Sequence, residues 1–278
     1  MKTQLIKLFL LSLVNSIFLI GYSQADSSKT KVNFKLGTYY NSRLNYYGRT
    51  DSLQSSGIFP MAELWLNNKF YINAAPVFTY SNQPGLQYAG TVATAGYLFN
   101  NGKYATHIYA VKPFYVNNSQ LVQSALKAQT AASFTWLNKI LNITAGADVK
   151  FSNNIDLGAT AGLDHIIRKK LPGNAMLIID PSFYVYAGTQ RFTESYYKKT
   201  NFLLFPGSEQ LVQDYVKKFS ILSYEFSAPL IYAKGKWMLM ATPAYVIPQN
   251  LVTVENRSDL SERGEKMFYM TAGVKVSL

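Results

Sequence analysis

The clearest regularity in this sequence is the alternation of apolar and polar residues in its last segment. From residue 268 to residue 278, the even positions hold Phe, Met, Ala, Val, Val and Leu, and the odd positions hold Tyr, Thr, Gly, Lys and Ser. A β-strand with this alternation has one oily face and one wet face. The same period of two recurs in residues 32–40, 69–78 and 141–150. No helical period is evident after residue 30.

Twelve segments of this kind can be recognised, and an even number suits a closed antiparallel barrel that crosses a membrane. The expected strands are residues 31–40, 58–67, 69–80, 90–100, 103–116, 127–137, 139–151, 155–168, 174–188, 219–233, 236–247 and 267–278.

The connections between these segments alternate in length. Short turns rich in Asn and Gly, which supply the positive φ of tight hairpins, fall at 67–69, 100–103, 138–139, 171–174 and 234–236. Longer polar loops fall at 41–57, 81–89, 117–126, 189–218 and 248–266, and only the link at 152–154 breaks the rule. The chain is therefore expected to form a single antiparallel transmembrane β-barrel of about twelve strands, with short periplasmic turns and long extracellular loops.

Proline is the main feature that a closed barrel does not favour, because each one removes a hydrogen-bond donor from the ladder. The prolines inside expected strands are Pro60, Pro76, Pro113, Pro181, Pro229 and Pro243. Four of them, Pro60, Pro76, Pro181 and Pro243, lie at a similar distance from the short turns, so bulges at one level of the wall are expected to accommodate these four.

The N-terminus has the pattern of a secretory signal peptide. Lys2 and Lys7 precede an apolar run, and Ser23-Gln24-Ala25 is a small-x-small cleavage site. We therefore expect residues 1–25 to be removed on export and residues 26–278 to form the barrel. The alternative is an uncleaved anchor helix, but the apolar run is shorter than the roughly 20 residues that a span needs.

Composition narrows the class further. The 278 residues contain no Cys and 2 His, but 21 Tyr and 17 Phe. A disordered tail would lack the aromatic residues, and a thiol-redox protein or a cysteine-based zinc protein would need Cys. The formal net charge of the full sequence is +12, of which Lys2 and Lys7 belong to the predicted signal peptide. The remaining excess of cations is dispersed over turns and loops, so a nucleic-acid partner is not expected.

With an export signal, paired amphipathic strands and an amphipathic last strand at 267–278, the chain resembles Gram-negative outer-membrane β-barrel proteins. In that class the last strand is read by the barrel-assembly machinery, so the resemblance assigns the assembly signal to Phe268 and Leu278. It implies a location in the cell outer membrane. Cations on the short turns are expected to contact outer-membrane lipids, and those on the long loops either contact lipopolysaccharide or belong to ordinary solvated loops. The resemblance names no solute.

Aromatic residues near the short turns are expected to form a girdle at the membrane interface. The alternative is that they belong to the core of a soluble β-sandwich. The girdle residues are Trp65, Tyr97, Phe99, Tyr104, Trp136, Tyr232 and Trp237.

Charged residues on the polar faces are expected to line the lumen, where five acids and four bases make a nearly balanced interior. They form either a channel whose charge pairs set selectivity or a structural network that fills a small barrel. The predicted lumen residues are Lys35, Glu63, Lys112, Asp148, Lys150, Asp156, Asp180, Glu225 and Lys275.

An enzyme would have to depend on His107 or His165, and both are interpreted as interfacial residues. Twelve-stranded barrels include the outer-membrane phospholipase, whose motif is His-x-Ser-Asn-Gly, but this chain has Thr106-His107-Ile108-Tyr109-Ala110. No catalytic residue, metal site or cofactor is therefore predicted.

The expected function is that of a small, porin-like channel for polar solutes. The alternative is a plugged structural barrel or assembly partner, and a lipid-modifying enzyme is a weaker third hypothesis. The 189–218 loop contains apolar residues such as Tyr196 and Phe202, so it is the expected plug, lid or protein-partner site.

Overall fold

The structure is a computed structural model that describes residues 31–82, 85–117, 119, 121–190, 218–251 and 262–278. The predicted signal peptide, residues 191–217 of the largest loop and residues 252–261 lie outside the described residues. In the described part of the chain, no helix is long and apolar enough to cross a membrane.

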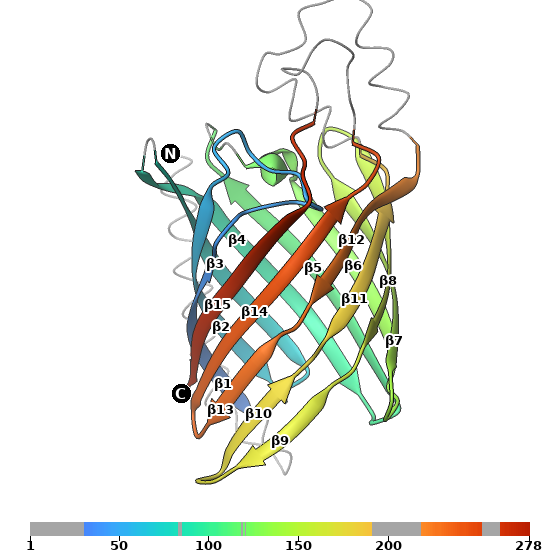
Figure 1. The fold of residues 1–278 in the computed structure, drawn as a ribbon. Helices are drawn as coiled ribbons and strands as arrows, with labels where there is room; N and C mark the ends of the chain where they lie inside the picture. The colour runs from blue at the N-terminus through green and yellow to red at the C-terminus, as the bar shows by residue number, and fades with distance from the viewer. Residues whose placement is uncertain (1–30, 83–84, 118, 120, 191–217, 252–261) are drawn as a thin grey trace, which may run out of the picture. The chain divides into compact units, whose positions relative to one another are not determined.

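The chain forms a closed antiparallel β-barrel (Figure 1), and β1 pairs with β15 to close the wall. Three wall strands are each interrupted by two residues, between β8 and β9, β10 and β11, and β12 and β13, so that the fifteen segments form twelve wall strands. The predicted architecture is confirmed. The segments are β1 (Val32–Asn41), β2 (Ser56–Leu66), β3 (Phe70–Ser81), β4 (Gly85–Asn100), β5 (Tyr104–Tyr115), β6 (Ala128–Trp136), β7 (Asn142–Phe151), β8 (Ile155–Asp164), β9 (Ile167–Leu171), β10 (Ala175–Ile179), β11 (Ser182–Gly188), β12 (Ser220–Ser227), β13 (Leu230–Lys234), β14 (Trp237–Pro248) and β15 (Met267–Ser277).

The short turns have the backbone that their residues predict. Asn67 and Asn68 both adopt positive φ, at 53° and 55°, between β2 and β3. Gly102, Gly173 and Gly235 supply positive φ in other turns on the same rim. These turns define the short-turn rim, at the bottom of Figure 1, and the longer connections define the long-loop rim.

Two prolines face each other across a gap in the wall. The β2–β3 pairing runs from Ser56 to Ile58 and resumes at Ala62, so Pro60 and Pro76 oppose each other where the ladder is missing. Because neither residue has a backbone N–H, this position cannot form its two hydrogen bonds.

Three further prolines lie along a diagonal of the wall. The carbonyl oxygens of Pro181, Pro229 and Pro243 accept hydrogen bonds from the backbone N–H groups of His165, Asp180 and Ala228, at 3.1, 3.0 and 3.1 Å. The hydrogen-bond ladder therefore continues past each break. Bulges were predicted at the prolines, and among the described strand pairs the register shift beside a proline is the one at Val77/Phe78, next to Pro76.

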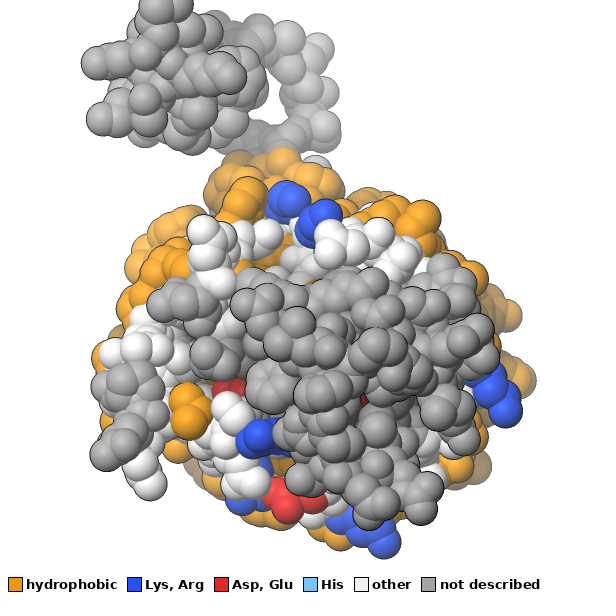
Figure 2. Space-filling model, turned by 90° about the horizontal axis from the view of Figure 1, so that it is seen from above, with side chains coloured by type: hydrophobic (Ala, Val, Ile, Leu, Met, Phe, Trp, Pro, Cys, Tyr) orange, Lys and Arg blue, Asp and Glu red, His pale blue; other side chains and the backbone are white. Residues whose placement is uncertain are grey.

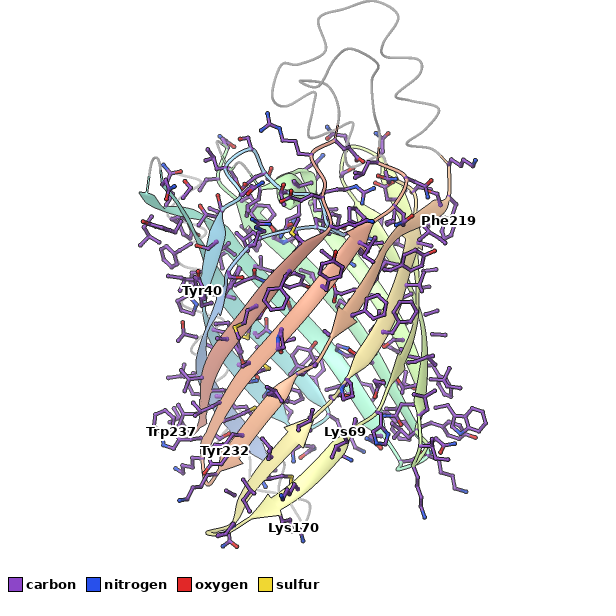
Figure 3. All side chains as sticks on the ribbon, in the orientation of Figure 1. Tyr40, Lys69, Lys170, Phe219, Tyr232 and Trp237 are labelled. Carbon is purple, nitrogen blue, oxygen red and sulfur yellow. The ribbon has the colours of Figure 1, made fainter. Side chains whose placement is uncertain are left out.

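The outer wall is apolar. Hydrophobic side chains surround the perimeter of the barrel in Figure 2, and Trp237 and Leu239 on β14 are 59% and 50% exposed. Figure 3 shows aromatic residues at two heights, with Phe219 near the long-loop rim and Tyr232 and Trp237 near the short-turn rim. An apolar band flanked by aromatic residues is typical of a wall that faces lipid.

The long-loop mouth contains the main hydrophobic cluster among the described residues. Leu44 from the β1–β2 connection and Leu121 from the β5–β6 connection pack with Val77 and Ala89 of the wall. The β5–β6 connection continues into a short 3₁₀ helix, η2 (Val122–Ala125). Both connections therefore fold into the barrel mouth.

Candidate functional site

The first charged cluster of the interior lies on β1, β2 and β15. Lys275 Nζ lies 2.9 Å from Glu63 Oε1, and Glu63 is 6% exposed. Lys35 is directly paired with Glu63 across β1 and β2, and its Nζ lies 4.4 Å from the centre of the Trp65 ring. Two cations thus lie near one carboxylate, and Lys275 forms the ion pair with it, which leaves this wall with one excess positive charge.

The placement of Trp65 corrects the girdle prediction. Trp65 points into the barrel, where its Nε1 donates to Glu63 Oε2 at 2.8 Å and its ring stacks on Tyr71 at 4.7 Å. Residues two apart in a strand share a face, so a lumen position for Glu63 required the same face for Trp65. Five of the other predicted girdle residues are exposed, and Tyr232 is half-buried beside the outward-facing Leu239. The exposed five are Tyr97, Phe99, Tyr104, Trp136 and Trp237.

The second charged cluster lies on β7 and β8. Lys150 forms an ion pair with Asp148, and both side chains are buried. Asp156 is directly opposite Lys150 on β8, is fully buried, and accepts a hydrogen bond of 2.6 Å from Thr189 Oγ1. Two carboxylates against one ammonium group leave this wall with one excess negative charge.

The remaining predicted acids also lie on the interior face. Tyr269 Oη donates to Glu225 Oε2 at 2.9 Å. Asp180 lies beside Asp164 near the short-turn rim, where Asn142 Nδ2 donates to Asp164 Oδ2 at 2.7 Å. Most of the interior acids therefore have a fixed hydrogen-bond partner.

Lys112 is the exception among the predicted lumen residues. Its side chain is exposed, on the same face of β5 as Phe114, and Nζ donates to the Lys127 carbonyl at 2.8 Å. Tyr109 on β5 lines the interior cavity. Side chains alternate along a strand, so Lys112, three residues later, points to the opposite face and outward. The lumen assignment of Lys112 was wrong.

Tyrosine rings cover glycines on the inner wall. Tyr71 is paired with Gly96, and a β-carbon at Gly96 would lie 2.6 Å from the Tyr71 ring. Tyr184 over Gly162 repeats this arrangement, with a corresponding separation of 2.1 Å. Because glycine has no side chain, each ring can lie against the wall and leave the centre of the lumen free.

A large polar cavity extends inward from the short-turn rim. Its volume is about 1120 Å³, and it runs from Asn138 and Lys139 at the rim to Asp148 and Tyr186 deeper in the barrel. Ser, Thr, Asn, Asp and Tyr side chains supply much of its lining, which is the surface expected around water and polar solutes. The lining includes Ser133, Thr135, Asn142, Thr144, Thr160 and Asp164.

The β1–β2 connection is the part of the interior that the sequence did not predict. Tyr47 and Arg49 fold inward, and Arg49 is 2% exposed. Burial is the main reason why the pKa of both Tyr46 and Tyr47 is raised, so both hydroxyls stay neutral at physiological pH. An inward loop carries no two-residue period, so the pattern that predicted the strands gave no signal for it.

The two histidines occupy different places. His107 faces the lumen, contrary to its interfacial interpretation, and Nε2 lies 2.8 Å from the Tyr71 hydroxyl. His165 Nδ1 lies 2.5 Å from the Ile140 carbonyl oxygen at the β8–β9 break. Across the described ranges, no group of three or more His, Cys, Asp and Glu side chains is arranged to hold a metal ion.

Comparison with known proteins finds similarity in solved structures only. No family model and no curated protein sequence matches. The KdgM porin is 9% identical, with a TM-score of 0.48 and coverage of 88% of this chain and 99% of that chain. An outer-membrane channel from Pseudomonas putida F1 is 10% identical (TM-score 0.46; 92% and 100% covered), and the NanC porin is 11% identical (TM-score 0.42; 88% and 100% covered). At these values the likeness does not extend to solute or mechanism.

Proposed function

We propose that this protein is an outer-membrane channel for small polar solutes. The observation that carries the proposal is the polar cavity of about 1120 Å³, which opens at the short-turn rim inside an apolar wall. A polar interior within a lipid-facing barrel is the arrangement that transmembrane pores use.

The clusters on opposite walls support a channel that distinguishes charge. The β1–β2–β15 wall carries Lys35, Lys275 and Glu63, and the β7–β8 wall carries Asp148, Lys150 and Asp156. An ion that passes between them meets one wall of each sign, so its path depends on its own charge.

The proposal also assigns the surroundings of the barrel. Exposed cations at the short-turn rim would meet anionic phospholipid headgroups, and the long-loop rim would meet lipopolysaccharide. Lys170, in β9 of the β9–β10 hairpin, lies at the short-turn rim in Figure 3. Phe268 and Leu278, each 61% exposed, remain the proposed signal for the barrel-assembly machinery, and the 189–218 loop remains the proposed protein-partner site.

A plugged structural barrel is the second candidate. The packing of Leu44 and Leu121 inside the long-loop mouth favours it, because both connections narrow the way out of the cavity. Such a barrel would insert in the membrane and bind partners without passing solute.

Single-channel recording tests the choice directly. Residues 26–278 are refolded in detergent, checked by a heat-sensitive compact band on a gel, and inserted into a planar bilayer under a salt gradient. The channel proposal predicts steady current steps and a reversal potential different from zero. Insertion of the compact form without current would reject it in favour of the plugged barrel.

A further inference from the structure

The β1–β2 connection, residues 42–55, contains a tight turn at Tyr46–Arg49. The backbone N–H of Tyr46 donates to the Arg49 carbonyl at 2.8 Å, and the reverse bond measures 3.1 Å. Tyr47 and Gly48 have φ values of 55° and 77°, which is the backbone of a type I′ hairpin. Positive φ is rare for an aromatic residue, so other contacts must hold Tyr47 in this conformation.

The tip of this turn reaches the far side of the barrel. Lys150 Nζ on β7 lies 5.5 Å from the centre of the Tyr47 ring, and the Tyr186 ring on β11 lies 5.2 Å away. β7 is the sixth wall strand from β1 in either direction around the barrel. One path passes through β2–β6, and the other passes through β15, β14, β12, β11 and β8. The connection therefore starts at one wall and crosses the lumen to the diametrically opposite wall.

Gly48 fits closely in this position. A β-carbon on Gly48 would lie 2.9 Å from the Pro248 ring at the end of β14. The tip is thus bounded by Lys150, Tyr186 and Pro248, which belong to three different wall strands. This close fit fixes where Tyr47 lies across the interior.

The guanidinium group of Arg49 holds the turn in place through five hydrogen bonds. Nε donates to Glu262 Oε2 at 3.2 Å, Nη1 donates to the carbonyls of Tyr47 and Leu222 at 3.1 and 3.2 Å, and Nη2 donates to Gln190 Oε1 and the Gln249 carbonyl at 2.7 and 3.2 Å. A guanidinium group has five N–H donors, and all five are used.

The acceptors come from separate parts of the chain. Tyr47 belongs to the turn itself and Leu222 to β12, whereas Gln190 follows β11, and Gln249 and Glu262 belong to the β14–β15 connection. The Arg49–Glu262 ion pair is almost fully buried, with side-chain exposures of 2% and 3%. Loss of the guanidinium would therefore remove its hydrogen bonds to three other elements at once. The turn would keep the backbone hydrogen bonds from Thr50 N–H to the Arg263 carbonyl at 2.9 Å and from Glu265 N–H to the Gly48 carbonyl at 3.3 Å.

We infer that Arg49 is a latch that holds Tyr47 across the lumen, and that Tyr47 with the Asp148–Lys150 pair forms the constriction that sets the size limit for solutes. This inference rests on the proposed channel function. Tyr47 is the specificity-determining side chain, and Arg49 is a positioning residue that acts through it.

The chain supplies a matched control for the latch. Arg43 and Glu265 join the same two connections, with Arg43 Nη1 3.0 Å from Glu265 Oε1, but their side chains are 35% and 49% exposed. Arg43→Gln removes the same charge from the same loop without touching the buried network. Exposed pairs contribute little, so this variant should behave as the unmodified protein does.

The experiment compares unmodified protein, Arg49→Gln and Arg43→Gln by two measurements. The first is single-channel conductance, together with the largest polyethylene glycol that reduces it. The second is the rate at which a membrane-impermeant maleimide labels Thr50→Cys, a buried position next to Arg49 in a chain with no other thiol. We expect Arg49→Gln to raise conductance by at least about twofold, admit larger polymers and label faster.

Tyr47→Ala separates the constriction from the latch. It keeps the Tyr47 carbonyl that Arg49 binds, so we expect a larger polymer limit with slow labelling of Thr50→Cys. This variant also provides the test if Arg49→Gln does not insert.

The possible outcomes have distinct meanings. Equal conductance, polymer limit and labelling in Arg49→Gln and Arg43→Gln would overturn the latch, and an unchanged polymer limit in Tyr47→Ala would overturn the constriction. Faster labelling of Arg49→Gln without current from any protein would support the latch and reject the channel function.

Discussion

The ring of Tyr71 on β3 lies directly over Gly96 on β4, its cross-strand partner, so closely that a β-carbon at Gly96 would be 2.6 Å from the ring. The ring also stacks on Trp65, and its hydroxyl lies 2.8 Å from His107 Nε2. Because Gly96 has no side chain, the rings of Trp65, Tyr71 and His107 can lie in a row along the inner wall.

Gly96→Ala should narrow the lumen, because the added methyl group displaces the Tyr71 ring from the wall. We expect lower single-channel conductance and a loss of stability of about 1–3 kcal/mol from overpacking. Gly146→Ala is the control, since its new β-carbon would lie 3.2 Å or more from its neighbours and meets no aromatic ring. Equal conductance in the two variants would show that the ring does not depend on Gly96.

Charge substitutions in the first cluster should shift ion preference in opposite directions. Glu63→Gln removes the carboxylate that pairs with Lys275 and lies opposite Lys35, so the reversal potential should move toward anion preference. Lys275→Met should move it toward cations. Because Lys275 is 20% exposed, the cost in stability should be below the about 3–5 kcal/mol of breaking a fully buried pair.

Lys112→Met is the control for these charge substitutions. It removes a cation that points away from the lumen. We expect no change in reversal potential. A shift as large as that of Lys275→Met would mean that cations outside the lumen, and not the interior pair, set the ion preference.

The three tryptophans should report three-dimensional placement through fluorescence quenching in single-tryptophan variants. Trp136 and Trp237 are 53% and 59% exposed on the outer wall, so lipids that carry bromine in their acyl chains should quench them. Trp65 is inside the barrel and should respond weakly to these lipids. Strong quenching of Trp65 by brominated lipid would contradict its inward orientation.

Removal of the Asn142 amide should destabilise the barrel near the short-turn rim. Asn142 and Asp164 are 5% and 8% exposed and share a hydrogen bond of 2.7 Å. Asn142→Leu leaves the carboxylate short of a donor, and we expect a loss of about 1–3 kcal/mol in unfolding free energy. Urea titration in lipid vesicles measures it, and a double-mutant cycle with Asp164→Asn should show coupling. Additive effects would indicate that the bond contributes nothing to stability.

Local chemistry along the sequence determined the wall of this protein. A period of two predicts a strand wherever it occurs, and Asn and Gly predict tight turns because they tolerate positive φ, as Asn67, Asn68 and Gly102 do. These signals depend on neighbouring residues only. They sufficed for twelve strands, their order and the alternation of short and long connections.

Tertiary structure decided which side of the wall certain residues occupy and what fills the barrel. Alternation shows that Glu63 and Trp65 share a face, but pairing with Lys275 and Tyr71 places that face inside. The loop was harder to foresee, because Arg49 binds Gln190, Leu222, Gln249 and Glu262, which lie far away in sequence. Contacts of this kind exist only after the barrel has closed, so no local pattern encodes the segment that crosses its lumen.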